Sequence, residues 1–156
     1  MPPRRLVLGL GNDLLGDDGI GLRVVESLRC RPALAHFDFD TAEGAGLGLL
    51  DILAGYQRAL IVDCVPADGD PPGQVLRLSP DELAARALTL SSHYAGLPQV
   101  LALGRRLGLA MPEVEVLAIS VKDPYRIGPG LSPALHRALP SVVAQVERAL
   151  LEGDRA

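Results

Sequence analysis

The stretch at residues 6–21, LVLGLGNDLLGDDGIG, constrains the fold of this chain more than any other. Its first three residues are apolar, as is typical of a strand that is buried on both faces. Glycines that permit a tight turn follow, and from Ile20 apolar residues recur at helical spacing. The stretch therefore predicts a strand, a glycine-lined loop and a helix, with the acidic pair Asp17 and Asp18 at the helix entrance. Functional groups of α/β proteins collect at such junctions.

Strand and helix patterns alternate along the rest of the chain. Strand patterns lie at residues 33–40, 59–62, 74–78 and 113–121, and helical patterns lie at residues 47–54, 79–87, 100–107 and 133–150. This alternation predicts an α/β fold with three layers, in which a mostly parallel sheet of four or five strands has helices on both faces. The strand at residues 74–78 follows a short loop, so it could be an antiparallel edge. We expect a single domain over residues 1–156, because no repeat or interior linker divides the chain.

Two helix starts carry recognisable capping residues. Ser79, Pro80 and Glu82 fit a capping box, with serine as the cap, proline at the first helical position and glutamate three residues after the serine. We therefore interpret Glu82 as structural rather than catalytic. Ser132 and Pro133 predict the start of the last helix in the same way.

Charge and aromatic content argue against a nucleic-acid partner. The formal net charge is −4, aromatic residues make up 3% of the chain and tryptophan is absent, whereas phosphate contacts need a cationic surface and base stacking needs aromatic rings. No stretch reaches the roughly 18 apolar residues that a membrane span requires. We expect a cytoplasmic protein without a membrane partner. Cys30 and Cys64 form no close-spaced motif, and a reducing compartment is the simpler interpretation, with a disulfide between them as the alternative.

Three residues at the edges of predicted elements could converge on one rim of the sheet. Asp18 lies at the first loop–helix junction, Asp63 ends a buried strand, and His93 lies in the lead-in to a helix. Two carboxylates and one imidazole form a three-ligand set with an open position, suited to a divalent transition metal. Each residue also has a structural interpretation. Asp17 or Asp18 could cap the helix, Asp63 could be a solvated loop residue, and an isolated histidine is more often structural than a ligand.

Other chemistries have weaker support. The first glycines lack the third glycine of a dinucleotide-binding loop, because Leu14 stands at that position. The Gly-Lys-Ser/Thr of a phosphate-binding loop and the G-x-S-x-G of a serine nucleophile are absent as well. Cys64 could in principle be a thiol nucleophile, but it follows a buried strand, and we interpret it as a small core residue. Nucleotide binding therefore stays a minor alternative.

Residues 6–28, LVLGLGNDLLGDDGIGLRVVESL, resemble the N-terminal signature of the hydrogenase maturation endopeptidases. Three further segments match that family in the same order, namely LIVDCV around Asp63, SSHYAGL around His93 and GLSP before the last helix. The resemblance thus spans essentially the whole chain. It implies a phosphorylase/hydrolase-like fold, a twisted five-stranded sheet between helices, with the site in a cleft at one sheet edge.

The resemblance also implies the site and the reaction. By position, the family's metal-contacting residues fall on Asp18, Asp63 and His93, which are therefore the expected catalytic and metal-binding residues. The implied activity is that of an endopeptidase that removes the C-terminal extension of a nickel-containing hydrogenase large-subunit precursor after nickel insertion. Nickel would come with the precursor, so the resting enzyme, which we expect to be a monomer, need not hold a metal. The alternative is a non-cleaving, chaperone-like module that binds nickel or the precursor.

Two loops depart from the family pattern. Many relatives carry an acidic-Gly-Gly-Thr signature where this chain has TAEG at residues 41–44, with Asp40 or Glu43 as substitutes for the missing aspartate. Many also have a Pro-Glu pair where this chain has VKDP at residues 121–124. Both loops are expected to touch the substrate, so the departures bear on partner choice.

Asp17 is a candidate general base.

Overall fold

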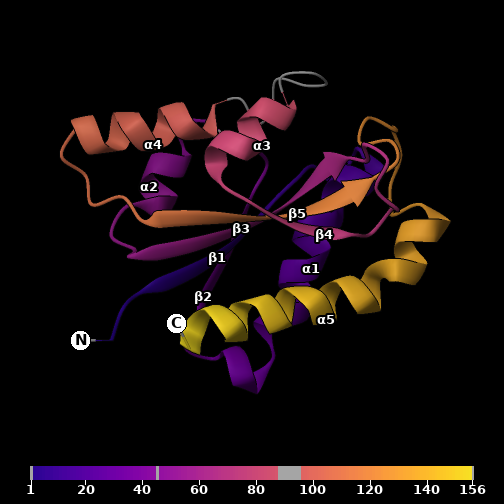
Figure 1. Cartoon of the computed structure of the whole chain (residues 1–156), viewed down its shortest axis with the longest axis horizontal. Coiled ribbons are helices and arrows are strands. Elements are labelled where there is room, and N and C mark those ends of the chain that lie inside the picture. Colours follow the sequence, from indigo (N-terminus) through magenta and orange to yellow (C-terminus); the bar gives the residue numbers. More distant parts are fainter. Residues whose placement is uncertain (1, 45, 88–95, 156) are drawn as a thin grey trace.

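The computed structural model describes residues 2–44, 46–87 and 96–155 of the chain. Its strands are β1 (Arg5–Leu10), β2 (Asp38–Ala42), β3 (Arg58–Pro66), β4 (Val75–Leu78) and β5 (Glu113–Val121). They form one sheet in the order β2-β1-β3-β5-β4, in which only β4 runs antiparallel to its neighbour (Figure 1). The predicted mostly parallel five-stranded sheet is confirmed, and so is the antiparallel edge strand.

Helices cover both faces of this sheet. They are α1 (Ile20–Arg29), α2 (Leu49–Leu53), α3 (Pro80–Ala87), α4 (Leu97–Arg106) and α5 (Pro133–Arg155), with the 3₁₀ turns η1 (Gly16–Gly19) and η2 (Pro32–Leu34). Figure 1 shows α1 and α5 on one face and α2, α3 and α4 on the other. The three-layer α/β architecture is therefore as predicted.

Each face of the sheet has its own apolar core. On the central strand β3, Leu60, Val62 and Cys64 pack into the core under α1 and α5. Ile61 and Val65, which point the opposite way, pack into the core under α2, α3 and α4. A strand that is covered on both faces needs an uninterrupted apolar run, which is why this strand was recognisable in the sequence.

The predicted helix caps are present. The Ser79 amide donates a hydrogen bond to Glu82 Oε1 at 3.3 Å, and the Glu82 amide donates to Ser79 Oγ at 3.1 Å, which completes the capping box. At the start of α5, the Leu135 amide donates to Ser132 Oγ at 3.4 Å and the His136 amide donates to the Ser132 carbonyl at 2.8 Å. Glu82 is thus structural, as expected.

Two predicted elements begin later than the sequence pattern indicates. The strand expected at residues 33–40 starts only at Asp38, because a 3₁₀ turn that begins at Pro32 takes up the preceding residues. The helix expected from residue 47 starts at Leu49, and Leu47 is left 67% exposed. The helix ends at Leu53, one residue before the end of the predicted pattern, and Gly55 follows with a φ of +90°.

Two expectations from composition can be set beside the structure. None of the helices in the described part of the chain combines the length and hydropathy that a membrane crossing requires. Cys30 is exposed and Cys64 is buried, and the two cysteines form no disulfide with each other.

Candidate functional site

Glycines bring the entrance of α1 against the ends of β1 and β3. A Cβ atom on Gly21 would lie 2.4 Å from the Val62 carbonyl oxygen and 2.6 Å from the Leu10 carbonyl oxygen, so only glycine lets the helix approach both strands this closely. A Cβ on Gly11 would lie 2.2 Å from the Asp18 carbonyl oxygen. These close approaches place Asp18 beside the later residues of β3, which include Asp63 and Cys64. The strand continues to Pro66, so the prediction that Asp63 ends it is wrong.

The result is a buried cluster at the carboxyl edge of the sheet. One side-chain ligand atom from each of Asp18, Asp63 and Cys64 lies within 4.8 Å of the other two. Asp18 is 8% exposed, and Asp63 and Cys64 are fully buried. The structure therefore brings together two of the three predicted site residues. The third, His93, lies outside the described residues, and its place in the site stays a prediction.

Backbone and thiol groups hold the two carboxylates. Asp18 Oδ2 accepts a hydrogen bond from the Asn12 amide at 2.9 Å, and Asp18 Oδ1 accepts one from Cys64 Sγ at 3.1 Å. Asp63 Oδ1 accepts a hydrogen bond from the Cys64 amide at 2.7 Å. These three hydrogen bonds fix the orientation of the two carboxylates.

Cys64 is the member of this cluster that the sequence interpretation missed. Its burial agrees with the expected core position, but its thiol also contacts Asp18. Strand alternation could have revealed this contact. Cys64 follows Leu60 and Val62 at two-residue spacing and therefore points to the α1 face, where Asp18 lies at the helix entrance.

Asp17 does not cap α1, which corrects one of the sequence interpretations. The cap position is Gly19, because residues 16–19 form the turn η1 and move the helix start past the acidic pair. Asp17 Oδ1 instead accepts a hydrogen bond from the Ser132 amide at 2.6 Å, immediately before α5, and lies 4.0 Å from the Arg126 guanidinium. Asp17 thus joins the first loop to the start of α5, and Asp18 likewise makes no side-chain cap of α1.

Two loops form a rim beside the cluster. The Gly128 amide donates to the Leu14 carbonyl at 3.0 Å, so the loop after β5 is held against the loop after β1. Leu14 is 73% exposed and Ile127 is 85% exposed on this rim. A mostly apolar cavity of about 350 Å³ lies next to it, between Asp17, Lys122 and the first turn of α5. Exposed apolar groups of this kind suit contact with another polypeptide.

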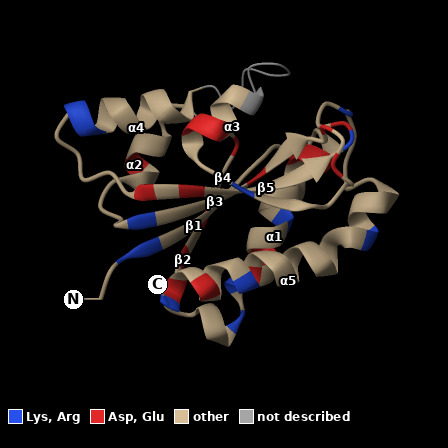
Figure 2. Cartoon of the chain, viewed as in Figure 1, with Lys and Arg blue, Asp and Glu red and all other residues tan. Residues whose placement is uncertain are grey.

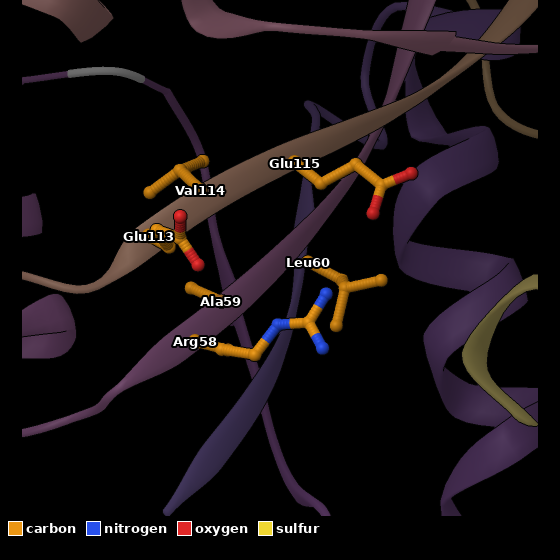
Figure 3. A pocket seen from close by; sticks show the side chains of 6 residues that line it. All are labelled: Arg58, Ala59, Leu60, Glu113, Val114 and Glu115. Carbon is orange, nitrogen blue, oxygen red and sulfur yellow. The ribbon is translucent and has the colours of Figure 1, made fainter. Parts of the chain in front are cut away.

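A second pocket, of about 220 Å³, lies at the opposite edge, where β3 and β5 begin (Figure 3). Two of its charged side chains, Arg58 and Glu115, already have partners. Arg58 Nη1 donates to the Gly153 carbonyl at 3.0 Å, and Glu115 forms an ion pair with Arg77 at 2.9 Å. The carboxyl edge is thus the better candidate for a functional site, as expected for a parallel sheet.

Comparisons with known proteins agree with this geometry. The model of a family described as hydrogenase maturation protease matches residues 23–149. The chain is 32% identical over 152 residues to the Hydrogenase 2 maturation protease of Escherichia coli (strain K12), which covers 96% of this chain and 92% of that protein. It is 29% identical to the hydrogenase expression/formation protein HupD of Rhodobacter capsulatus, over 96% of this chain and 72% of that protein.

Solved structures give the same result. The hydrogenase maturating endopeptidase HybD from E. coli superimposes with a TM-score of 0.79 at 30% identity, over 96% of this chain and 93% of that one. The [NiFe] hydrogenase maturation protease HybD from Thermococcus kodakarensis superimposes with a TM-score of 0.68 at 27% identity, over 94% and 98% of the two chains. The protein described here therefore belongs to the hydrogenase maturation protease family and is a peptidase.

Proposed function

We propose that this protein removes the C-terminal extension of a nickel-containing hydrogenase large-subunit precursor after nickel has been inserted. Membership of the family supplies the reaction class, peptide-bond hydrolysis, and the role in hydrogenase maturation. The observation that carries the finer proposal is the convergence of Asp18 and Asp63, two buried carboxylates, at the carboxyl edge of the sheet. Such a pair is a poor structural element and a good receptor for a cation.

In this proposal, Asp18, Asp63 and His93 recognise nickel that the precursor already holds. Two carboxylates and an imidazole can bind a divalent transition metal, but carboxylates are hard ligands, so the affinity of this set for nickel is modest. A modest affinity suits transient recognition of metal on another protein. A cation beside the two carboxylates also relieves their mutual repulsion, which favours binding of the loaded precursor over the empty one.

Hydrolysis adds water across the peptide bond, so one group must accept a proton and the leaving amine must gain one. A metal ion at the site could polarise the scissile carbonyl or lower the pKa of the attacking water. Asp17 is engaged with the Ser132 amide at the start of α5. We therefore assign proton transfer to the buried pair Asp18 and Asp63 rather than to Asp17.

The loops at the carboxyl ends of β2 and β5 are the surfaces through which we expect the precursor to be selected. The Gly11 amide donates to the Ala42 carbonyl at 3.1 Å, so the unusual residues 41–44 adjoin the loop that carries Asp18. Residues 121–124 lead into the exposed rim at Ile127. Departures from the family pattern in both loops thus bear on partner choice.

The proposal is tested by cleavage of nickel-loaded and nickel-free precursor, followed by intact mass. We expect the wild-type protein to cut only the loaded form, and Asp63→Asn and His93→Gln to lose this activity. Matched controls are Asp51→Asn, in the exposed first turn of α2, and His36→Gln, at the opposite edge of the sheet. Both controls should cleave like the wild-type protein.

Two results would contradict the proposal. Equal cleavage of the loaded and empty precursors by the wild-type protein would show that the protein does not recognise nickel. Full activity of both Asp63→Asn and His93→Gln would remove these residues from the site. Binding of the loaded precursor without loss of mass would instead indicate the chaperone-like alternative.

A further inference from the structure

Cys64 contacts both carboxylates of the cluster. Its thiol donates to Asp18 Oδ1 at 3.1 Å, and its backbone amide donates to Asp63 Oδ1 at 2.7 Å. The side chain is fully buried and lies in the core under α1 and α5, at the point where this core meets the site. One residue therefore links the end of β3 to the entrance of α1.

The Asp18 carboxylate is held at both of its oxygens. The Asn12 amide donates to Oδ2 at 2.9 Å, and the Cys64 thiol donates to Oδ1. A single hydrogen bond would leave the carboxylate able to rotate about its Cβ–Cγ bond, whereas donors on opposite oxygens fix its plane. Groups that orient a metal-contacting side chain in this way typically affect metal affinity or activity by about 10- to 100-fold.

We propose that Cys64 is a positioning residue for Asp18. By donating its thiol hydrogen to Asp18 Oδ1, it holds that carboxylate in the orientation in which Asp18 and Asp63 together face the substrate metal. This inference rests on the proposed function, because it assumes that Asp18 binds the nickel held by the precursor. Cys64 itself contacts neither the metal nor the scissile bond in this role.

A purely packing role for Cys64 makes the opposite prediction for two substitutions. If Cys64 only fills the core, alanine is the better replacement, because serine would bury a hydroxyl among apolar groups. If Cys64 positions Asp18, serine is the better replacement for activity, because its hydroxyl can still donate to Asp18 Oδ1 whereas alanine has no donor. The rank order of the two variants therefore separates the roles.

The hydrogen bond can be measured without any cleavage reaction. In the variant Cys30→Ser, Cys64 is the sole thiol, and its infrared S–H stretching band should lie at lower frequency than that of the exposed Cys30, measured in Cys64→Ala. Replacing Asp18 by alanine in the Cys30→Ser background should shift the Cys64 band back towards higher frequency. A Cys64 band that coincides with that of Cys30, or that does not respond to Asp18→Ala, would overturn the inference.

The functional effect is measured as kcat/KM on nickel-loaded precursor, with thermal unfolding as the check on folding. We expect Cys64→Ala to lose about tenfold, the lower end of the range because a thiol is a weak donor, and Cys64→Ser to stay within about threefold of the wild-type protein. Full activity of Cys64→Ala together with a loss in Cys64→Ser would overturn the inference. If the wild-type protein cleaves the loaded and empty precursors equally, the proposed nickel recognition fails, whereas the infrared result still reports on the Cys64–Asp18 contact.

Discussion

Acidic residues have different partners at the two edges of the sheet. At the amino edge, carboxylates lie beside arginines: Asp154 pairs with Arg5, Asp38 with Arg4 at 3.4 Å, and Glu115 with Arg77 at 2.9 Å. Figure 2 shows this mixture of basic and acidic residues where the strands begin and α5 ends. At the carboxyl edge, Asp18 and Asp63 are buried close together and accept hydrogen bonds from neutral groups.

We infer that the acidic residues of the amino edge serve stability and that those of the carboxyl edge serve function. Partly exposed ion pairs such as those at the amino edge each contribute up to about 1 kcal/mol to stability. Burial removes water from a carboxylate, and this desolvation opposes folding. A protein retains such an arrangement where function needs it.

The substitution Asp63→Asn should have the largest effect on cleavage. The amide keeps the shape of the side chain and can still accept the Cys64 amide hydrogen, but it removes one of the two buried carboxylates. We expect cleavage of the loaded precursor to fall by about a hundredfold or more. The thermal unfolding midpoint should stay close to that of the wild-type protein, because the amide keeps the shape and the acceptor oxygen of the side chain.

The matched control at the amino edge is Asp154→Asn, which removes the partner of Arg5 and His36. Here we expect normal cleavage and a loss of about 1 kcal/mol in the free energy of unfolding, measured by denaturant titration. If Asp154→Asn impaired cleavage as strongly as Asp63→Asn, the two edges would not differ in function.

The next largest effect is expected from Gly21→Ala, which tests how the carboxyl edge is assembled. The added methyl group would meet the carbonyl oxygens of Val62 and Leu10, so α1 must move away from the sheet and carry Asp18 with it. We expect a loss of about 2 kcal/mol in the free energy of unfolding, together with reduced cleavage.

Gly48→Ala is the control for this substitution, because a Cβ atom there has nothing within 4 Å and the backbone φ is −59°. It should change stability by less than about 0.5 kcal/mol. Equal stability of the Gly21→Ala and Gly48→Ala proteins would show that close helix packing is not required.

Substitutions of the neighbours Asp17 and Asp18 should have different effects: at Asp17 on stability, and at Asp18 on cleavage. Asp17→Ala leaves the Ser132 amide at the start of α5 without its acceptor, which should lower the free energy of unfolding by about 1 kcal/mol. Asp17→Asn keeps an acceptor and should recover most of that loss. Both variants should retain cleavage, whereas Asp18→Asn should lose it. Cleavage that depends on Asp17 as strongly as on Asp18 would restore Asp17 as a candidate base.

The smallest effect concerns Tyr56 at the amino edge. Burial raises the pKa of Tyr56, and its hydrogen bond of 2.8 Å to Asp38 acts in the same direction. Because the folded-state pKa lies above the unfolded value of about 10, the contribution of the neutral phenol is complete below pH 10 and is lost as the pH rises through the folded-state pKa. Unfolding titrations from pH 9 upwards should show wild-type stability falling relative to Tyr56→Phe. Parallel curves for the two proteins would contradict this.

Elements with strong local signals were predictable from the sequence. The apolar run of β3 required a strand covered on both faces, and the capping box at Ser79 fixed the start of α3. Elements that depend on neighbours were less predictable. The 3₁₀ turn η1 displaced the start of α1 beyond Asp17, because the loop after β1 is held by contacts from residues more than a hundred positions away.

Local sequence patterns were enough to predict the α/β class, the mostly parallel sheet, and Asp18 and Asp63 as candidates at its carboxyl edge, since periodicity, capping and glycine placement are local properties of the chain. Only the tertiary structure decided the different roles of Asp17 and Asp18 and the contact of the Cys64 thiol with Asp18. These depend on the approach of α1 to β3 and of α5 to the first loop. These contacts join residues that are distant in the sequence, and local sequence patterns do not show which distant residues will meet.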